Sequence, residues 1–241
     1  MSAYRIQSHR TAFMFIVFSI VLSACSVFSS SYPAGEQAKQ TSDRAVKTHF
    51  GYRFEAKAPT KAQFIFYPGA KVEPQAYALL AQRLAEQNIQ VDLVDFPLDL
   101  AITKSSIAED IIDESLPTVI AGHSLGGAMA ARFLKKNWKQ VDGLVLLASY
   151  SLDSYGLQHT TLPVLSIYAE LDLIATVEEI LDKQAYLPAN TQYVMIKGGN
   201  HGQFGDYGAQ SGDGEALISA QAQLDQTVEA IIGFIDGLSG L

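Results

Sequence analysis

The chain has 241 residues, of which 48% are hydrophobic and 17% are charged, which suits one globular domain with a sizeable core. Its formal net charge is −8, and no stretch is rich in Lys and Arg, which argues against nucleic-acid binding. Cys25 is the only cysteine, so an intramolecular disulfide is excluded.

The N-terminus is typical of an export signal. Residues 1–24 contain Arg5 and Arg10, followed by an apolar run that is too short for a comfortable membrane span. Leu-Ser-Ala then precedes Cys25, a pattern that resembles the lipobox of bacterial lipoproteins, in which the signal is cut before the cysteine and the thiol is lipidated. An uncleaved anchor and an ordinary signal with a bystander cysteine are the open alternatives. The lipoprotein interpretation predicts an exported protein, anchored by lipid to a membrane of a bacterial cell envelope.

After the lipidated Cys25, the small, polar and aperiodic segment 25–44 is expected to be a flexible tether. The globular domain is expected over 45–241. Strands are expected over 49–55, 62–67, 90–96, 118–121, 143–148, 162–168 and 191–196, and helices over 77–86, 107–112, 128–134 and 215–235. Continuous apolar strands that alternate with helices predict an α/β fold, a mostly parallel sheet with helices on both faces.

The most informative segment is Gly122–Gly127, with the sequence Gly-His-Ser-Leu-Gly-Gly, between an expected strand and an expected helix. Strand, glycine, serine, glycine and helix in this order are the G-x-S-x-G nucleophile elbow. The flanking glycines allow a turn that is too tight for a Cβ on either side of Ser124. Ser124 is therefore the expected nucleophile.

A serine hydroxyl needs a base within hydrogen-bond reach. His201 follows the last expected strand in a glycine-flanked loop, at the strand end where the active sites of parallel sheets gather. The other histidines fit less well. His9 lies in the signal, and His49 lies in an early strand. His123 is next to the serine but is expected to point away from it, and His159 lies in a polar connection. His201 is the expected base, and a surface histidine is the alternative.

The third member of the site should be a carboxylate that follows a strand between the serine and the histidine, where it would orient the imidazole. Asp172 has this position, and the order Ser, Asp, His is the one that α/β-hydrolases use. Glu170 is the nearest competitor and Asp153 a weaker one. Asp206 follows the histidine closely and is expected to fix its loop.

An oxyanion intermediate needs two N–H donors. The N–H of Leu125, at the start of a helix, is expected to supply one of them. The second is expected from the segment after the strand 62–67, with Ala70 as the donor and Lys71 as its neighbour. Lys71 is given no charge role, because a solvated surface lysine is the commoner case.

Three segments carry a resemblance to a known family: 67–72, 122–127 and 198–208. They are similar to segments of the α/β-hydrolase fold superfamily, and most similar to a bacterial alpha/beta hydrolase fold-5 group of small exported proteins. The resemblance covers about residues 45–241. Relatives often have Gly-Gly after Tyr-Pro, where this chain has Gly69-Ala70, so the oxyanion assignment is less secure than the others.

The resemblance implies a serine hydrolase with Ser124 as nucleophile, Asp172 as acid and His201 as base. The leading hypothesis is a carboxyl-ester hydrolase that works through an acyl-enzyme on a small-molecule ester. The connection between 148 and 162 is too short for a cap, so a minimal hydrolase fold without a cap domain is expected. The loop 204–214 is either a wall of the site or a structural turn. No metal or organic cofactor is expected. The alternatives are an acyltransferase that uses the same three residues and a non-catalytic lipoprotein scaffold with a hydrolase fold.

Overall fold

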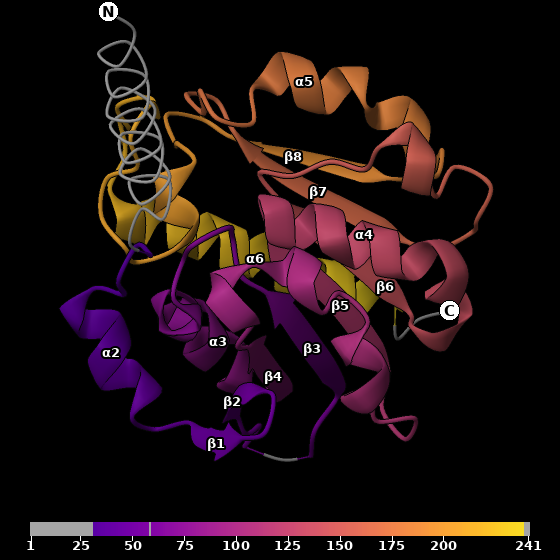
Figure 1. The fold of residues 1–241 in the computed structure, drawn as a ribbon, viewed down its shortest axis with the longest axis horizontal. Coiled ribbons are helices and arrows are strands. Elements are labelled where there is room, and N and C mark those ends of the chain that lie inside the picture. The colour runs from indigo at the N-terminus through magenta and orange to yellow at the C-terminus, as the bar shows by residue number, and fades with distance from the viewer. Residues whose placement is uncertain (1–30, 58, 239–241) are drawn as a thin grey trace, which may run out of the picture. The chain divides into compact units, whose positions relative to one another are not determined.

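The computed structural model describes residues 31–57 and 59–238. The expected signal peptide and Cys25 lie outside the described residues. Within them, eight strands form one sheet in the order β1-β2-β4-β3-β5-β6-β7-β8 (Figure 1). The strands are β1 (Val46–Thr48), β2 (Gly51–Phe54), β3 (Ala62–Tyr67), β4 (Ile89–Val94), β5 (Thr118–His123), β6 (Gly143–Leu147), β7 (Val164–Ala169) and β8 (Gln192–Ile196).

The sheet is parallel from β4 to β8 and antiparallel only where the β1–β2 hairpin joins β4. In the register of the central strands, Tyr67 at the end of β3 lies opposite Gly122 of β5, and His123 lies opposite Leu147 at the end of β6. The carboxyl ends of these strands therefore meet at one edge of the sheet. The loops that carry chemistry in open parallel sheets gather at this edge.

Helices cover both faces of the sheet, as the alternating strands and helices predict. They are α2 (Glu36–Ser42), α3 (Ala78–Ala85), α4 (Leu125–Asn137), α5 (Val177–Asp182) and α6 (Ala220–Leu238). Alternate residues of β3 divide between two cores: Phe64 and Phe66 pack on the side of α3 and α6, and Ile65 and Tyr67 on the side of α4. The expected α/β architecture, a mostly parallel sheet covered on both faces, is confirmed.

The C-terminal part of the expected tether is folded instead of flexible. The N–H of Tyr32 donates to the carbonyl of Lys71, and the N–H of Ala34 to the Glu73 carboxylate at 2.9 Å. Helix α2 follows, with Ala38 completely buried. The expectation of a flexible tether is therefore wrong for residues 32–44. Its small residues pack closely on the domain, but it has no large apolar side chains at helical spacing, the pattern that would have predicted a helix.

Three further elements differ from expectation. The helix expected over 107–112 is the 3₁₀ turn Ile107–Asp110, and α6 begins at Ala220 instead of 215. The later start has a cause: the N–H groups of Leu217 and Ile218 both donate to the carbonyl of Gly198, which holds this segment against the loop after β8. Helix α5 was not expected, and it begins with a capping box between Thr176 and Glu179.

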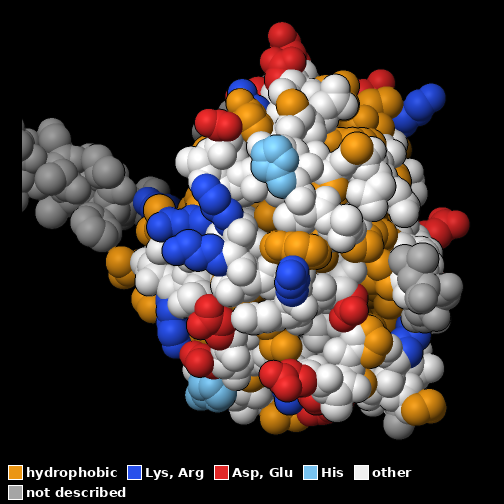
Figure 2. Space-filling model, turned by 90° about the vertical axis from the view of Figure 1, so that its right-hand side faces the viewer, with side chains coloured by type: hydrophobic (Ala, Val, Ile, Leu, Met, Phe, Trp, Pro, Cys, Tyr) orange, Lys and Arg blue, Asp and Glu red, His pale blue; other side chains and the backbone are white. Residues whose placement is uncertain are grey.

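The connection from β6 to β7 contains a single 3₁₀ turn, Asp153–Tyr155, so the fold has no cap domain between these strands. Among the helices of residues 31–57 and 59–238, none is long and apolar enough to cross a membrane. On the face drawn in Figure 2, several basic side chains lie together near one edge and others stand singly, with acidic and hydrophobic side chains interspersed among them.

Candidate active site

Ser124 lies at the point where β5 turns into α4, in a backbone conformation that few residues other than glycine adopt. Its φ is 52° and its ψ is −125°. Such a conformation costs on the order of 1–3 kcal/mol and persists only where its surroundings fix it. Here the N–H of Ser124 donates to the carbonyl of Leu147 at 2.9 Å, and the Ser124 carbonyl accepts from the hydroxyl of Ser149 at 2.7 Å. Neighbouring β6 and the loop after it therefore hold the turn.

The glycines around Ser124 are required by close backbone contacts. A Cβ on Gly122 would lie 2.5 Å from the backbone of Gly126, and a Cβ on Gly126 would collide with the carbonyls of Tyr67 and Pro68. The first turn of α4 is thus pressed against the end of β3. The tight turn expected for 122–127 is present.

His201 and Asp172 are in contact. Nδ1 of His201 lies 2.8 Å from Oδ2 of Asp172, and both residues are at most 2% exposed. The other oxygen of Asp172 accepts from the N–H groups of Ile174 at 2.8 Å and Ala175 at 2.7 Å, which fixes the carboxylate. Nε2 of His201 is buried and has no hydrogen-bond partner among the described residues. A ring whose Nδ1–H donates to Asp172 keeps a free lone pair on Nε2, as a general base requires.

The His201 pair lies at the elbow. The ring of His201 packs against that of His123, the residue before Ser124, with the ring centroids 4.5 Å apart. The structure thus brings Asp172 and His201 to the strand end that carries Ser124.

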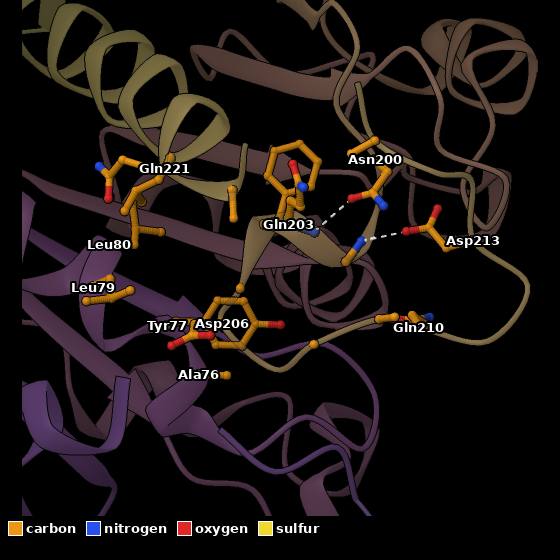
Figure 3. Close-up of a pocket in the computed structure, with 18 of the residues that line it drawn as sticks. Ala76, Tyr77, Leu79, Leu80, Asn200, Gln203, Asp206, Gln210, Asp213 and Gln221 are labelled. Atoms are coloured by element: carbon orange, nitrogen blue, oxygen red, sulfur yellow. Dashed lines mark hydrogen bonds between the residues drawn. The ribbon is translucent and has the colours of Figure 1, made fainter. Parts of the chain in front are cut away.

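The backbone around His201 is fixed from both sides. Gln223 of α6, completely buried, accepts from the N–H of Asn200 at 3.0 Å and donates to its carbonyl at 2.8 Å. After the histidine, Asp213 accepts from the N–H of His201 at 3.3 Å. It also accepts from the N–H of Gly202 at 2.8 Å (Figure 3). Asn200 also accepts from the N–H of Gln203 at 3.1 Å. The loop 204–214 thus has a structural role, since Asp213 within it holds the histidine.

The other candidate carboxylates form no hydrogen bond with His201 in the part of the chain that the structure describes, and they make different interactions. Glu170 is exposed, and its carboxylate accepts from the N–H of Gly198 at 2.8 Å. Asp153 lies exposed in the 3₁₀ turn after β6. Asp206 fixes its loop, as expected: its side chain accepts from the N–H of Ala38 at 3.1 Å and its carbonyl accepts from that of Gly35 at 2.7 Å.

The turn after β3 leaves one N–H free. The N–H of Gly69 donates to the hydroxyl of Tyr77 at 3.1 Å, and that of Lys71 donates to the carbonyl of Asp99 at 2.7 Å. Between them, the N–H of Ala70 has no acceptor among the described residues, and the same holds for the N–H of Leu125 at the start of α4. Because Gly126 touches the carbonyls of Tyr67 and Pro68, the two free donors belong to neighbouring segments.

Two residues of this site were not expected from the sequence. His123 is 1% exposed, and its Nδ1 lies 2.8 Å from the hydroxyl of Tyr77. Burial, and next the nearby His201, lower the pKa of His123 well below its ordinary value, so its ring stays neutral. Asp213 was also missed, because its role depends on a loop that folds back over His201. Neither residue stands in a pattern that could have identified it.

The loop after His201 also forms one wall of a cavity of about 660 Å³ (Figure 3). Leu79 and Leu80 of α3 and Leu224 of α6 also line it. Ser124, Asp172 and His201 do not line this cavity, but Asn200 and Asp213, which hold the backbone around His201, do.

Comparisons with known proteins agree with the fold. The model of the alpha/beta hydrolase family matches residues 63–225, more than half of the chain. The chain belongs to the alpha/beta hydrolase family. No curated protein matches this alpha/beta hydrolase significantly by sequence.

Solved structures share its fold at low sequence identity. The alpha/beta hydrolase GrgF from Penicillium sp. sh18 superposes with a TM-score of 0.61 at 12% identity, over 79% of this chain and 94% of that one. Est1E from Butyrivibrio proteoclasticus gives 0.59 at 14% identity, over 82% and 98%. A monoacylglycerol lipase from Paleococcus ferrophilus gives 0.58 at 16% identity, over 76% and 98%. These similarities support a hydrolase fold.

Among residues 31–57 and 59–238, no group of three or more His, Cys, Asp or Glu side chains is arranged to hold a metal ion.

Proposed function

We propose that this alpha/beta hydrolase is a serine hydrolase of carboxyl esters that works through an acyl-enzyme. The observation that carries the proposal is the buried His201–Asp172 pair, packed against the residue before Ser124 with Nε2 unpartnered. A buried imidazole nitrogen without a partner is costly unless the protein uses it. A base for a neighbouring hydroxyl is the use that fits the elbow.

In the proposed reaction, Oγ of Ser124 attacks the ester carbonyl while its proton passes to Nε2 of His201. Asp172 accepts from Nδ1 and stabilises the imidazolium that forms. The N–H groups of Leu125 and Ala70 bind the oxyanion. The C–O bond to the alcohol then breaks, and the alcohol leaves with the proton from His201. A water molecule, deprotonated by His201, cleaves the acyl-enzyme and releases the acid and free Ser124.

The direct test uses the full chain, a fluorophosphonate probe and p-nitrophenyl esters of short acids, with the Ser124→Ala variant alongside. We expect the wild type to be labelled and to turn over, and the variant to do neither. Equal behaviour of the two proteins would refute the proposal. Acyl release that depends on an added alcohol or amine would instead show an acyltransferase.

We also propose that the chain is exported and lipidated at Cys25. The small residues before Cys25 and the apolar run 11–22 support this. Because the folded domain begins at Tyr32, only residues 26–31 would separate it from the anchor, at most about 25 Å of extended chain. Tyr32 bonds to Lys71, beside Ala70, so a lipid anchor would keep this edge of the sheet close to the membrane. Cys25→Ser should move the protein from the membrane to the soluble fraction, and retention in the membrane would contradict lipidation.

A further inference from the structure

Tyr77 and His123 form a buried hydrogen-bonded pair that the proposed chemistry does not use. Tyr77 lies just before α3, His123 is the last residue of β5, and each is 1% exposed. The Tyr77 hydroxyl lies 2.8 Å from Nδ1 of His123 and accepts from the N–H of Gly69 at 3.1 Å. Two polar side chains in the core at this point need a reason, since an apolar pair would fill the space without a desolvation cost.

The direction of these hydrogen bonds follows from counting donors. The N–H of Gly69 can only donate, so the Tyr77 oxygen accepts from it. If the Tyr77 proton points to Nδ1 of His123, only the Nε2–H of the histidine is unpaired. The opposite tautomer would leave both the tyrosine proton and Nε2 unpaired. The N–H of Gly69 therefore donates to the Tyr77 hydroxyl, which in turn donates to Nδ1 of a neutral His123, and these two hydrogen bonds form one series.

At one end of this hydrogen-bond series, the turn that carries the proposed oxyanion donor is fixed. Gly69 immediately precedes Ala70, and a Cβ on Gly69 would lie 2.9 Å from Nδ1 of His123 and 3.1 Å from the Tyr77 hydroxyl. The pair thus occupies the space beside Gly69 and holds its N–H. On the other side of Ala70, Lys71 is held by Asp99 and Tyr32. The free N–H of Ala70 lies between two fixed peptide groups.

At the other end of the hydrogen-bond series, the ring of His123 contacts the proposed base, His201. The His123 ring packs on that of His201 at 4.5 Å and on that of Phe204 at 5.7 Å. His201 must become positively charged during the reaction. A cationic neighbour at this distance would disfavour the positive charge on His201. A neutral His123 ring with a fixed tautomer packs against His201 without this repulsion.

We propose that Tyr77 and His123 are positioning residues that hold the oxyanion turn and the base His201 in one fixed arrangement around Ser124. The proposal rests on the proposed ester hydrolysis. It predicts that the Tyr77 hydroxyl acts on the chemical step more than on ester binding. An oxyanion donor that is displaced by a fraction of an ångström stabilises the transition state less, while the ground-state ester is affected little.

The test replaces one hydroxyl and keeps the ring. Tyr77→Phe should lower kcat for p-nitrophenyl butyrate by about 10- to 100-fold with KM within about twofold, less than the loss of a whole oxyanion donor. It should weaken inhibition by an arylboronic acid, which forms a charged adduct with the serine, by a similar factor. Tyr207→Phe is the matched control. Tyr207 is also buried and lies 6.4 Å from the His123 ring, but its hydroxyl bonds to Gln210 at 3.0 Å. This control should keep at least half of the wild-type kcat.

A second pair of variants separates positioning from folding. His123→Leu removes the acceptor, and His123→Asn keeps an acceptor oxygen near the position of Nδ1. We expect the Leu variant to lose as much kcat as Tyr77→Phe, the double variant to lose no more than either one, and the Asn variant to recover part of the loss. Wild-type kcat in Tyr77→Phe, an equal loss in Tyr207→Phe, or equal activity of the Leu and Asn variants would overturn the proposal. An inactive wild type would instead refute the proposed function.

Discussion

Oδ2 of Asp172 accepts from Nδ1 of His201 at 2.8 Å, in a position where both side chains are shielded from water. Glu170, two residues earlier, points instead to the backbone of Gly198 and is exposed. The chain thus offers two carboxylates at the end of one strand, and the geometry favours only one of them as the partner of the histidine.

Asp172→Asn should therefore reduce kcat by about 10⁴-fold, because the amide would favour the wrong tautomer of His201. Glu170→Gln should leave kcat within about threefold, since an amide oxygen can still accept from Gly198. Both values are measured with p-nitrophenyl butyrate at neutral pH. A loss in the Glu170 variant as large as that in the Asp172 variant would contradict this assignment.

Asp213 holds the peptide groups on both sides of the His201 side chain, so its charge should matter for the position of the base. In Asp213→Asn, an amide nitrogen replaces one accepting oxygen and leaves a backbone N–H unpaired, which costs about 1–3 kcal/mol of unfolding free energy. We expect a lower Tm and a reduced kcat. Asp206→Asn is the control, since its side chain bonds to Ala38 of α2. This control should lower Tm without a comparable loss of kcat. Equal kcat in the two variants would show that Asp213 does not position His201.

Gly126→Ala should destabilise the elbow strongly. Its Cβ would collide with the carbonyls of Tyr67 and Pro68, so the end of β3 and the start of α4 must separate. A loss of more than about 3 kcal/mol, measured by urea unfolding, is expected for such overpacking at backbone. Gly233→Ala in α6 is the matched control. Nothing lies within 4 Å of its added Cβ, and alanine in an exposed helix position should stabilise by about 1 kcal/mol. Similar effects of the two substitutions would contradict the tight packing at the elbow.

The N-terminal residues that the sequence marked as a tether should contribute to stability. A chain that begins at Ala45 lacks α2 and the hydrogen bonds of Tyr32, Ala34 and Gly35, and it exposes the surface that Ala38 covers. Its Tm should lie several degrees below that of a chain that begins at Ser31, as expected for a loss of about 1–2 kcal/mol. Equal melting temperatures would show that residues 31–44 are bound only loosely to the domain.

Much of the fold was predictable because each buried strand is a short apolar run. The strand 62–67 was predicted to the residue, and 118–123 and 143–147 to within two residues, since these runs are buried on both faces. Helix α2 was not predictable in the same way. Its buried residues are one alanine and two hydroxyl side chains (Ala38, Thr41 and Ser42), and a polar segment of this kind resembles a linker until its partner surface is known.

The candidate site was predictable only where motif and chain order carry information. Ser124 follows from its glycines, and Asp172 and His201 follow from their positions after later strands. The pairing of Tyr77 with His123 joins residues 46 positions apart, and no spacing rule connects them. Asp213 is equally hidden, because a glycine-rich loop must fold back before its carboxylate reaches the backbone of His201.

The buried His123 should also give the protein a distinctive dependence of stability on pH. Its pKa in the folded protein is lowered, first by burial and next by His201, whereas an unfolded histidine titrates near pH 6.5, a typical value. Below that pH the unfolded chain binds a proton that the folded protein does not bind. The unfolding free energy therefore falls as the pH is lowered, by up to about 1.4 kcal/mol per pH unit.

This slope can be assigned to His123 by comparing urea unfolding of the wild type and of His123→Leu between about pH 7.5 and pH 5, a range that spans the ordinary histidine pKa. The titratable groups that face the ring are His201, Tyr77 and Tyr207. Burial raises the pKa of both tyrosines, so neither loses its proton in this range. The variant should be less stable than the wild type at pH 7.5, because the Tyr77 hydroxyl loses its acceptor, and its unfolding free energy should fall less steeply towards pH 5. Parallel slopes for the two proteins would mean that His123 takes up a proton in the folded state. The inference that a neutral His123 packs against His201 would then be wrong.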